Sequence, residues 1–325
     1  MDSLVSVIIT TYYRDSSLQK AIESALAQSY EPIEVVVVDD SGEAYAESIV
    51  DDYEAKYVVH DENKGQIAGW HSGIKETTGK YIQLLDDDDW LDRRKIAQQI
   101  EALEDYPEAG AAYCGLTFSD GTTARPDNKV RGEILEKTLT LHFPPATTSS
   151  LLIEKEVLEE ILPLHNHQAG CDIPLKIELA RRTHYECVDE LLVYRSEDPD
   201  SQGKSKTAAN TRWWILNEYE ELYESLPDSV RRQALATTLR FEGMVYWKKD
   251  GWSPRAIANF AKVLRVAPDV RLEDVANLQL SLFGSIGLLL GRRIKEGLET
   301  IQSTTDEHNR SDDQSEDVSD YRIQS

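Results

Sequence analysis

A run of four aspartates, Asp86 to Asp89, directly follows the apolar segment 81–85. Like charges this close raise one another's pKa or recruit a cation. Asp86 and Asp88 share a face of an extended chain, and oxygen ligands select hard ions such as Mg²⁺ or Mn²⁺. In an acidic protein such a run is more often a solvated loop. A preceding strand favours a site instead, because ligands bind at the carboxyl ends of parallel strands.

A second acidic pair, Asp39 and Asp40, follows the apolar segment 33–38 and precedes Ser41 and Gly42. Carboxylates at such a position can accept hydrogen bonds from a nucleotide base or from ribose hydroxyls. The alternative is that they cap a helix at a tight turn. The pair alone does not separate these two interpretations.

The elements that must position these carboxylates alternate between strand and helix. Apolar, β-branched runs predict strands, and apolar residues at helical spacing predict helices. We expect strands at 5–9, 33–38, 57–59 and 81–85, and helices after Ser16, at 43–54, at 65–77 and around 96–103. This order predicts an α/β fold, with a mostly parallel sheet and helices on both faces.

The pattern loosens beyond residue 110, with strands expected at 111–118 and 186–194 and helices at 154–161 and 172–182. Residues 206–302 are expected to form a helical region. The tail 303–325 carries seven acidic and two basic residues, which predicts disorder. The segment 278–291 is too short to span a bilayer. Arg292, Arg293 and Lys295 follow it, so that 278–295 is either an interfacial helix with basic residues near lipid headgroups at a membrane surface or a buried helix of the C-terminal bundle.

Charge narrows the class of protein. The 325 residues include 35 Lys and Arg against 59 Asp and Glu, a net charge of −24. Such a surface disfavours nucleic-acid binding. The self-repulsion fades in molar salt, where the Debye length is about 3 Å, so we expect a halophilic source, an ordinary acidic cytosolic protein being the alternative. Three widely spaced cysteines, Cys114, Cys171 and Cys187, and the lack of a signal-peptide pattern favour a reducing, cytoplasmic location.

Five segments carry a family resemblance: VSVIITTYYR, AIESALAQSY, IEVVVVDDSG, NKGQIAGWHSGI and GKYIQLLDDDDWL. Their order and spacing resemble the family 2 glycosyltransferases. The resemblance continues more weakly to about residue 200 through TTSSLLIEKEVL, GCDIPLKIELA and LLVYRSEDPDS. It implies the GT-A fold, a Rossmann-like sheet with flanking helices, over residues 1–205. Residues 1–110 would be the nucleotide-binding half and residues 111–205 the acceptor-side half.

The resemblance also implies roles on the donor side. Asp40 matches the carboxylate that reads the nucleotide base, and Thr10 and Tyr12 match positions lining that pocket. Asp86 and Asp88 match the D-x-D pair that binds the donor sugar nucleotide and its divalent metal.

Further roles are implied around that pair. Asp89 is the acidic neighbour and a third candidate metal ligand. Asp172 matches the general base of inverting members, although Cys171 stands where glutamate is common. Arg195 is a candidate contact of the donor diphosphate, whereas Lys204 is expected to be solvated. Thr10, Tyr13 and the pair Trp70-His71 also depart from the family pattern, which bears on donor identity more than on reaction type.

These observations predict a metal-dependent inverting glycosyltransferase. A divalent cation neutralises the departing nucleoside diphosphate, and a carboxylate accepts the proton of the acceptor hydroxyl. We expect a UDP-linked donor and a lipid-linked saccharide acceptor at the cytoplasmic membrane face, for surface glycan assembly or protein N-glycosylation. A nucleotidyltransferase would need a glycine-rich basic loop, which SVIITTYYRD lacks. A non-catalytic acidic binding protein would not account for five ordered segments.

Overall fold

The computed structural model describes residues 3–196, 205–291 and 293–294. Lys204 and the tail 303–325 lie outside the described residues. The chain forms two compact units, Met1–Thr238 and Leu239–Ser325. The first unit contains the strands β1 (Val5–Thr11), β2 (Ile33–Asp39), β3 (Lys56–Val59), β4 (Tyr81–Asp86), β5 (Asp89–Leu91), β6 (Ala109–Phe118), β7 (Thr123–Ala124), β8 (Leu152–Glu154) and β9 (His184–Arg195).

The helices occupy both units, and α10 contains the division between them. They are α1 (Ser16–Leu26), α2 (Glu47–Val50), α3 (Gln66–Lys75), α4 (Lys95–Asp105), α5 (Leu135–Leu139), the 3-10 turn η1 (Thr148–Ser150), α6 (Lys155–Ile161), α7 (Asp172–Ala180), α8 (Lys206–Glu218), α9 (Glu220–Glu224), α10 (Asp228–Asp250), α11 (Pro254–Val266) and α12 (Leu272–Ser281).

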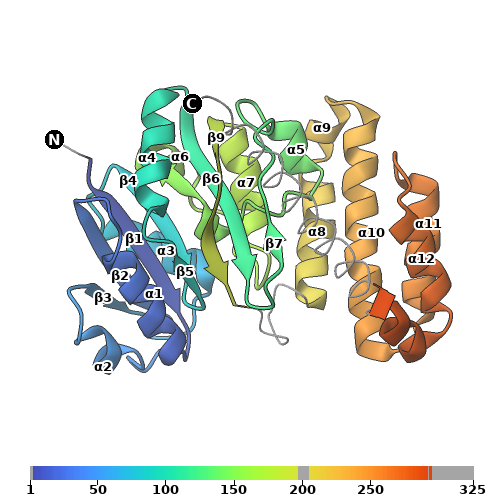
Figure 1. Cartoon of the computed structure of the whole chain (residues 1–325), viewed down its shortest axis with the longest axis horizontal. Helices are drawn as coiled ribbons and strands as arrows, with labels where there is room; N and C mark the ends of the chain where they lie inside the picture. Colours follow the sequence, from blue (N-terminus) through green and yellow to red (C-terminus); the bar gives the residue numbers. More distant parts are fainter. Residues whose placement is uncertain (1–2, 197–204, 292, 295–325) are drawn as a thin grey trace, which may run out of the picture. The chain divides into compact units, whose positions relative to one another are not determined.

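The described strands form one sheet in the order β3-β2-β1-β4-β8-β6-β9-β5, with β7 paired to β6. Strands β3, β2, β1 and β4 are parallel, as are β6 and β9. The register places Thr10 beside Asp86 and Thr11 beside Asp39. The carboxyl ends of β1, β2 and β4 therefore meet at one edge (Figure 1), and the register places Asp39 and Asp86 there.

The sheet is covered by helices on both faces, as the alternation of β1 shows. Val7 and Ile9 pack with buried residues of α1 and α4. Ile8 lies on the opposite face and packs with Trp70 and Ile74 of α3. Successive side chains of a strand point to opposite faces, so the continuous apolar run of β1 fills two cores. The predicted layered α/β fold is confirmed.

One predicted helix is much shorter than expected. The pattern at 43–54 suggested three turns, whereas α2 spans only Glu47–Val50. The reason lies in Asp39, whose two carboxylate oxygens accept hydrogen bonds from Ser41 N and Ala46 N, each at 2.8 Å. These bonds hold residues 41–46 in a loop, and Ala44 adopts a positive φ of 56° that no α-helix contains.

Helices α8 and α9 pack within the first unit. Ile215 and Tyr219 join a buried cluster with Ile173 and Ile177 of α7. The division of the chain at residue 205 stays a prediction, but the helices that follow it contribute to the core beside α7.

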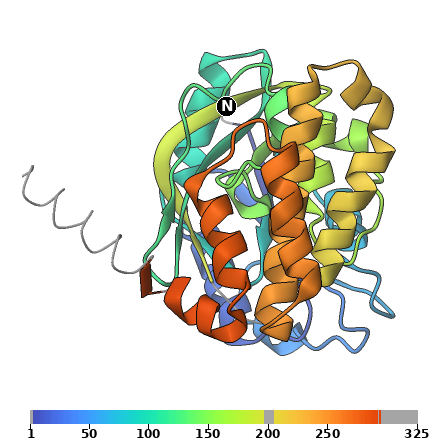
Figure 2. The same ribbon diagram turned by 90° about the vertical axis from the view of Figure 1, so that its right-hand side faces the viewer.

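In the second unit α11 and α12 lie side by side (Figure 2). Trp247 and Phe260 form its buried centre, with Leu278 and Leu288 packed against them. Other apolar residues of the same segment are exposed, including Phe283 at 65%. The segment 278–291 is thus only partly packed in its unit. Among the described residues, no helix combines the length and apolar character needed to cross a membrane.

Candidate functional site

Three aspartates gather where β4 ends and β5 begins. One carboxylate oxygen from each of Asp86, Asp88 and Asp89 lies within 4.8 Å of the others. Asp89 is only 1% exposed, and its Oδ2 accepts a hydrogen bond from Ser149 Oγ at 2.6 Å. Its Oδ1 is buried and has no hydrogen-bond partner among the described residues. The structure therefore brings the predicted metal ligands together and leaves one of their buried oxygens unsatisfied.

The pKa values of these aspartates reflect their crowding. Burial, followed by the charges of Asp89 and Asp88, raises the pKa of Asp86 well above its usual range. Burial raises the pKa of Asp89 to about 7, although Arg195 opposes the rise. Carboxylates that are withdrawn from water and repel one another bind a hard divalent cation favourably. The donor set, three carboxylates with one unsatisfied oxygen, fits Mg²⁺ or Mn²⁺.

Asp87 has a different role from its neighbours. Its Oδ2 accepts hydrogen bonds from Thr11 Oγ1 at 2.7 Å and from Tyr12 N at 3.3 Å. These bonds join the acidic turn to the end of β1. Burial raises the pKa of Asp87 to about 6, while the bond from Thr11 opposes the rise. Sequence reasoning did not single out Asp87, yet the alternation that placed Asp86 and Asp88 on one face placed Asp87 on the other.

Arg195 lies beside the cluster because β9 pairs with β5 at this point, in the register Asp89 to Arg195. Burial lowers the pKa of the guanidinium, but Asp89, Asp86 and Asp172 outweigh burial and raise it. Arg14 approaches from the end of β1, with Nη2 4.0 Å from Asp88 Oδ2. The edge therefore contains cations that can contact a diphosphate as well as carboxylates that can bind a metal.

Asp40 is 7% exposed and organises the loop before α3. Its Oδ1 accepts a hydrogen bond from Lys64 N and lies 2.6 Å from His60 Nδ1. Its Oδ2 accepts one from Gly65 N at 2.8 Å. Gly65 has a φ of 86°, which favours glycine. His60 and this pair of backbone donors were not apparent from the sequence, because only the fold brings them to Asp40.

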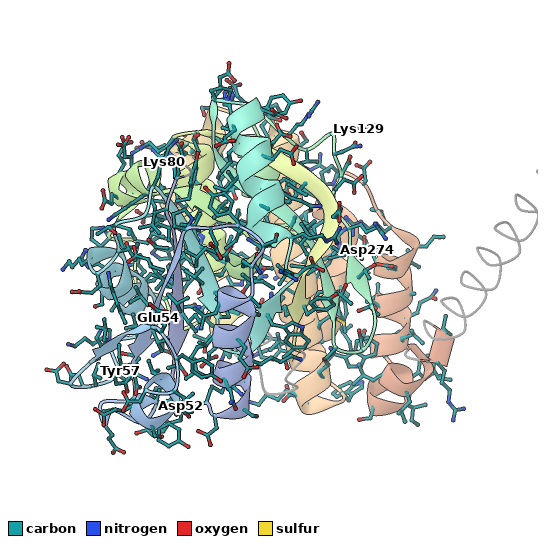
Figure 3. The ribbon with its side chains drawn as sticks, turned by 60° about the vertical axis from the view of Figure 1, so that its left-hand side comes forward. Asp52, Glu54, Tyr57, Lys80, Lys129 and Asp274 are labelled. Atoms are coloured by element: carbon teal, nitrogen blue, oxygen red, sulfur yellow. The ribbon has the colours of Figure 1, made fainter. Side chains whose placement is uncertain are left out.

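Thr10 and Tyr12 line the same edge. Thr10 packs against α3, where a Cβ on Gly69 would lie 2.8 Å from Thr10 Cγ2. Tyr12 is 51% exposed, and its ring contacts that of Tyr13, which in turn contacts Tyr45. An exposed aromatic row beside a polar edge is suited to stacking on a planar base. Tyr57 of β3, labelled in Figure 3, donates a hydrogen bond to the buried Asp39 at 2.6 Å.

Asp172 is the first residue of α7, and its charge acts on Arg195 together with the charges of Asp89 and Asp86. Its Oδ2 accepts a hydrogen bond from Lys176 Nζ at 2.8 Å, one helical turn later. Burial raises the pKa of Asp172, but Lys176, Arg195 and Arg212 outweigh it and hold the pKa below its usual value. Burial raises the pKa of the neighbouring Cys171 thiol, and the charges of both Asp172 and Asp86 raise it further. The predicted catalytic residue thus lies near the acidic turn and is ionised at neutral pH.

The comparisons with known proteins agree with this geometry. Residues 6–162 match the family described as Glycosyl transferase family 2. An uncharacterized glycosyltransferase of Rickettsia typhi is 29% identical over 268 residues, 77% of this chain and 81% of that protein. A glucosyl-dolichyl phosphate glucuronosyltransferase of Haloferax volcanii is 33% identical over 129 residues, 38% of this chain and 41% of that protein.

A solved structure shares the architecture. S. aureus TarS 1-349, crystallised with UDP-GlcNAc, superposes with a TM-score of 0.60 at 16% sequence identity, covering 86% of this chain and 90% of that one. This likeness shows the GT-A fold that the sequence predicted. With the family match and the related glycosyltransferases, it supports a family 2 glycosyltransferase.

Proposed function

We propose that this chain transfers a sugar from a nucleoside diphosphate donor to an acceptor hydroxyl, with inversion at the anomeric carbon. The observation that carries the proposal is the cluster of Asp86, Asp88 and Asp89 beside Arg195 and Asp172. These residues supply ligands for a divalent cation, a cation for a diphosphate and a carboxylate for a proton. A glycosyl transfer needs all three at one place.

In the reaction, the acceptor oxygen forms a bond to the anomeric carbon while the bond from that carbon to the diphosphate oxygen breaks. The diphosphate leaves with the bonding electron pair, and the hydroxyl proton passes to Asp172. A Mg²⁺ or Mn²⁺ held by Asp86, Asp88 and Asp89 would supply Lewis-acid stabilisation of the departing charge. Arg195 adds a fixed positive charge, and Lys176 orients Asp172 through their hydrogen bond.

On the donor side, we propose that Tyr12 stacks on the base and that Thr10 and Asp40 line the nucleotide pocket. The complex of the structurally similar TarS with UDP-GlcNAc supports a UDP-linked donor. Asp87 holds the end of β1 against the acidic turn, so the base-binding and metal-binding parts keep a fixed separation.

On the acceptor side, we propose a lipid-linked glycan at the cytoplasmic membrane face, used for surface glycan or glycoprotein assembly. The name of the related Haloferax volcanii enzyme, which acts on glucosyl-dolichyl phosphate, supports this acceptor class. The exposed apolar residues of 278–291, such as Phe283 and Ile286, support contact with a membrane surface. The net charge of −24 supports a protein that works in concentrated salt.

The test is calorimetric binding of UDP, GDP and CDP, each with and without Mn²⁺, in molar KCl. We expect one nucleotide to bind tightly only with the metal. Asp88→Asn should weaken that binding at least about tenfold, since loss of even an outer-shell partner of a metal ligand typically lowers metal affinity by about 10–100-fold. The matched control is Asp52→Asn, an exposed aspartate whose replacement leaves binding unchanged. Binding of no nucleotide by the folded protein, or full metal dependence in Asp88→Asn, would contradict the proposal.

A further inference from the structure

Lys95, the first residue of α4, is a fully buried lysine. Its hydrogen-bond partners are neutral, and no carboxylate in the described ranges of the chain pairs with it. Burial lowers the pKa of its ammonium to about 8, so the group is mostly protonated at neutral pH. Lysine is almost never fully buried unless it is paired, and the dipole of a helix disfavours a cation in the first turn. The hydrogen bonds of Lys95 must offset both costs.

The ammonium of Lys95 fixes the orientation of two buried amides. Its Nζ donates to Oε1 of Gln83 on β4 and to Oε1 of Gln99, one turn later on α4. A longer bond of 3.4 Å reaches Leu151 O. An ammonium has three donors and no acceptor, so only the oxygen of a side-chain amide can face it as a partner. The Nε2 atoms of both glutamines are therefore left to bond other groups.

Those two nitrogen atoms hold the 3-10 turn η1. Gln83 Nε2 donates to Ser149 O at 2.9 Å. Gln99 Nε2 donates to Ser150 O, also at 2.9 Å. Both glutamines and both serines are fully buried. The amides thus connect Lys95 to two consecutive backbone carbonyls of η1.

Ser149 connects η1 to the metal site. Its Oγ donates to Asp89 Oδ2 at 2.6 Å and accepts a hydrogen bond from Asp86 N at 3.2 Å. Because Ser149 engages Oδ2, the unsatisfied Oδ1 of Asp89 is the oxygen left for a cation. Groups that bond to metal ligands set the orientation of those ligands and the metal affinity. A displacement of Ser149 would therefore affect two of the three proposed ligands.

We propose that Lys95 is a positioning residue of the metal site. Through the two buried amides it holds Ser149 in place, and Ser149 orients Asp89 towards the cation. The inference rests on the metal-dependent transfer proposed above. Charge alone gives the opposite expectation, because a buried ammonium repels a cation and its removal would strengthen metal binding. The sign of the change in Mn²⁺ affinity therefore separates positioning from charge.

The experiment titrates Mn²⁺ into the full chain at a fixed excess of UDP and follows free Mn²⁺ by electron paramagnetic resonance. Ser149→Ala should lower the Mn²⁺ affinity about 10–100-fold, the usual cost of losing an outer-shell partner of a metal ligand. Lys95→Met, which keeps an unbranched side chain but removes the donors, should lower it about tenfold or more. The double variant should lie within about twofold of Ser149→Ala, because contacts in one network are not additive.

Ile100→Ala is the matched control, since Ile100 lies on the same helix and is buried in the apolar core. It should lose stability in urea unfolding but keep the wild-type affinity for Mn²⁺. If Lys95→Met does not fold, Gln83→Met carries the same expectation. That variant removes the donor to Ser149 O and leaves Gln99 bonded to the ammonium.

Unchanged or stronger Mn²⁺ binding by Lys95→Met, or losses that add in the double variant, would overturn the inference. Failure of the wild type to bind Mn²⁺ with UDP would overturn the proposed function instead. Crystal structures of the wild type and of Lys95→Met then test the inference by itself. Loss of the hydrogen bond from Ser149 to Asp89 in the variant supports it, and an intact bond overturns it.

Discussion

Replacing Glu34 by glutamine is expected to destabilise the sheet by about 3 kcal/mol at neutral pH. The Glu34 carboxylate, on β2, accepts hydrogen bonds from Ser6 Oγ and Thr78 N at 2.7 Å and from Lys56 Nζ at 2.8 Å. Burial alone raises its pKa, but these donors outweigh burial and lower the pKa from 4.5 to about 2. A tenfold change in ionisation corresponds to about 1.4 kcal/mol, and the difference between the two pKa values sets the magnitude.

The pH dependence follows from the direction of that change. The pKa of Glu34 is lower in the folded chain than in the unfolded one, so its stabilisation is complete above about pH 4.5 and is lost as the pH falls towards 2. At pH 4 about 0.8 kcal/mol of it is already gone. The free energies of unfolding of wild type and Glu34→Gln should therefore converge in acid.

The assay is urea unfolding of both proteins at pH 7, 5 and 4 in the same salt. Glu54→Gln is the control, since Glu54, labelled in Figure 3, is exposed. Taking the difference between two proteins cancels the titration of all other carboxylates. The reasoning would be refuted if the free energies of unfolding of wild type and Glu34→Gln differed by less than about 1 kcal/mol at pH 7, the value of a surface ion pair. It would also be refuted if this difference increased in acid.

Two further substitutions test single contacts in the two units. Asp274→Ala should cost the second unit about 3–5 kcal/mol in urea unfolding, because Asp274 is 2% exposed and binds Arg240 through two hydrogen bonds of 2.6 and 2.7 Å; a loss below about 1 kcal/mol would be the cost of a surface pair. Gly65→Ala should cost more than about 1–3 kcal/mol, because its φ of 86° and ψ of 165° lie in a region that is essentially restricted to glycine and because its Cβ would also lie 3.0 Å from Asn166 Oδ1. Gly121→Ala, which also has a φ of 86° but has open space where the Cβ would lie, should cost less, and an equal or larger loss would contradict the argument.

The sequence was most informative about the carboxyl edge of the sheet. The apolar runs before Asp39 and Asp86 are typical of buried parallel strands, and parallel strands place their carboxyl ends together. That argument needs no long-range information, and the observed register of Thr10 beside Asp86 confirms it. Local pattern failed at 43–54, because hydrogen bonds from Ser41 and Ala46 to the Asp39 carboxylate override helix propensity there.

Hydrogen-bond partners that are distant in the chain could not be predicted from the sequence, for a physical reason. His60 reaches Asp40, and Ser149 reaches Asp89, only after the sheet has assembled. Residue spacing along the chain does not predict such contacts, because they depend on how distant elements pack.

The aspartates of the site have pKa values that are shifted in opposite directions. Burial and mutual repulsion raise the pKa values of Asp86 and Asp89. A bound divalent cation would relieve this repulsion. Partial burial also raises the pKa of Asp172, yet Lys176 and Arg195 outweigh this effect and keep the carboxylate ionised. Asp86 and Asp89 are therefore suited to binding a metal, whereas Asp172 is already ionised and is suited to accepting a proton. In the proposed mechanism, environment rather than residue type would assign these roles, and the charge of Arg195 interacts with both groups.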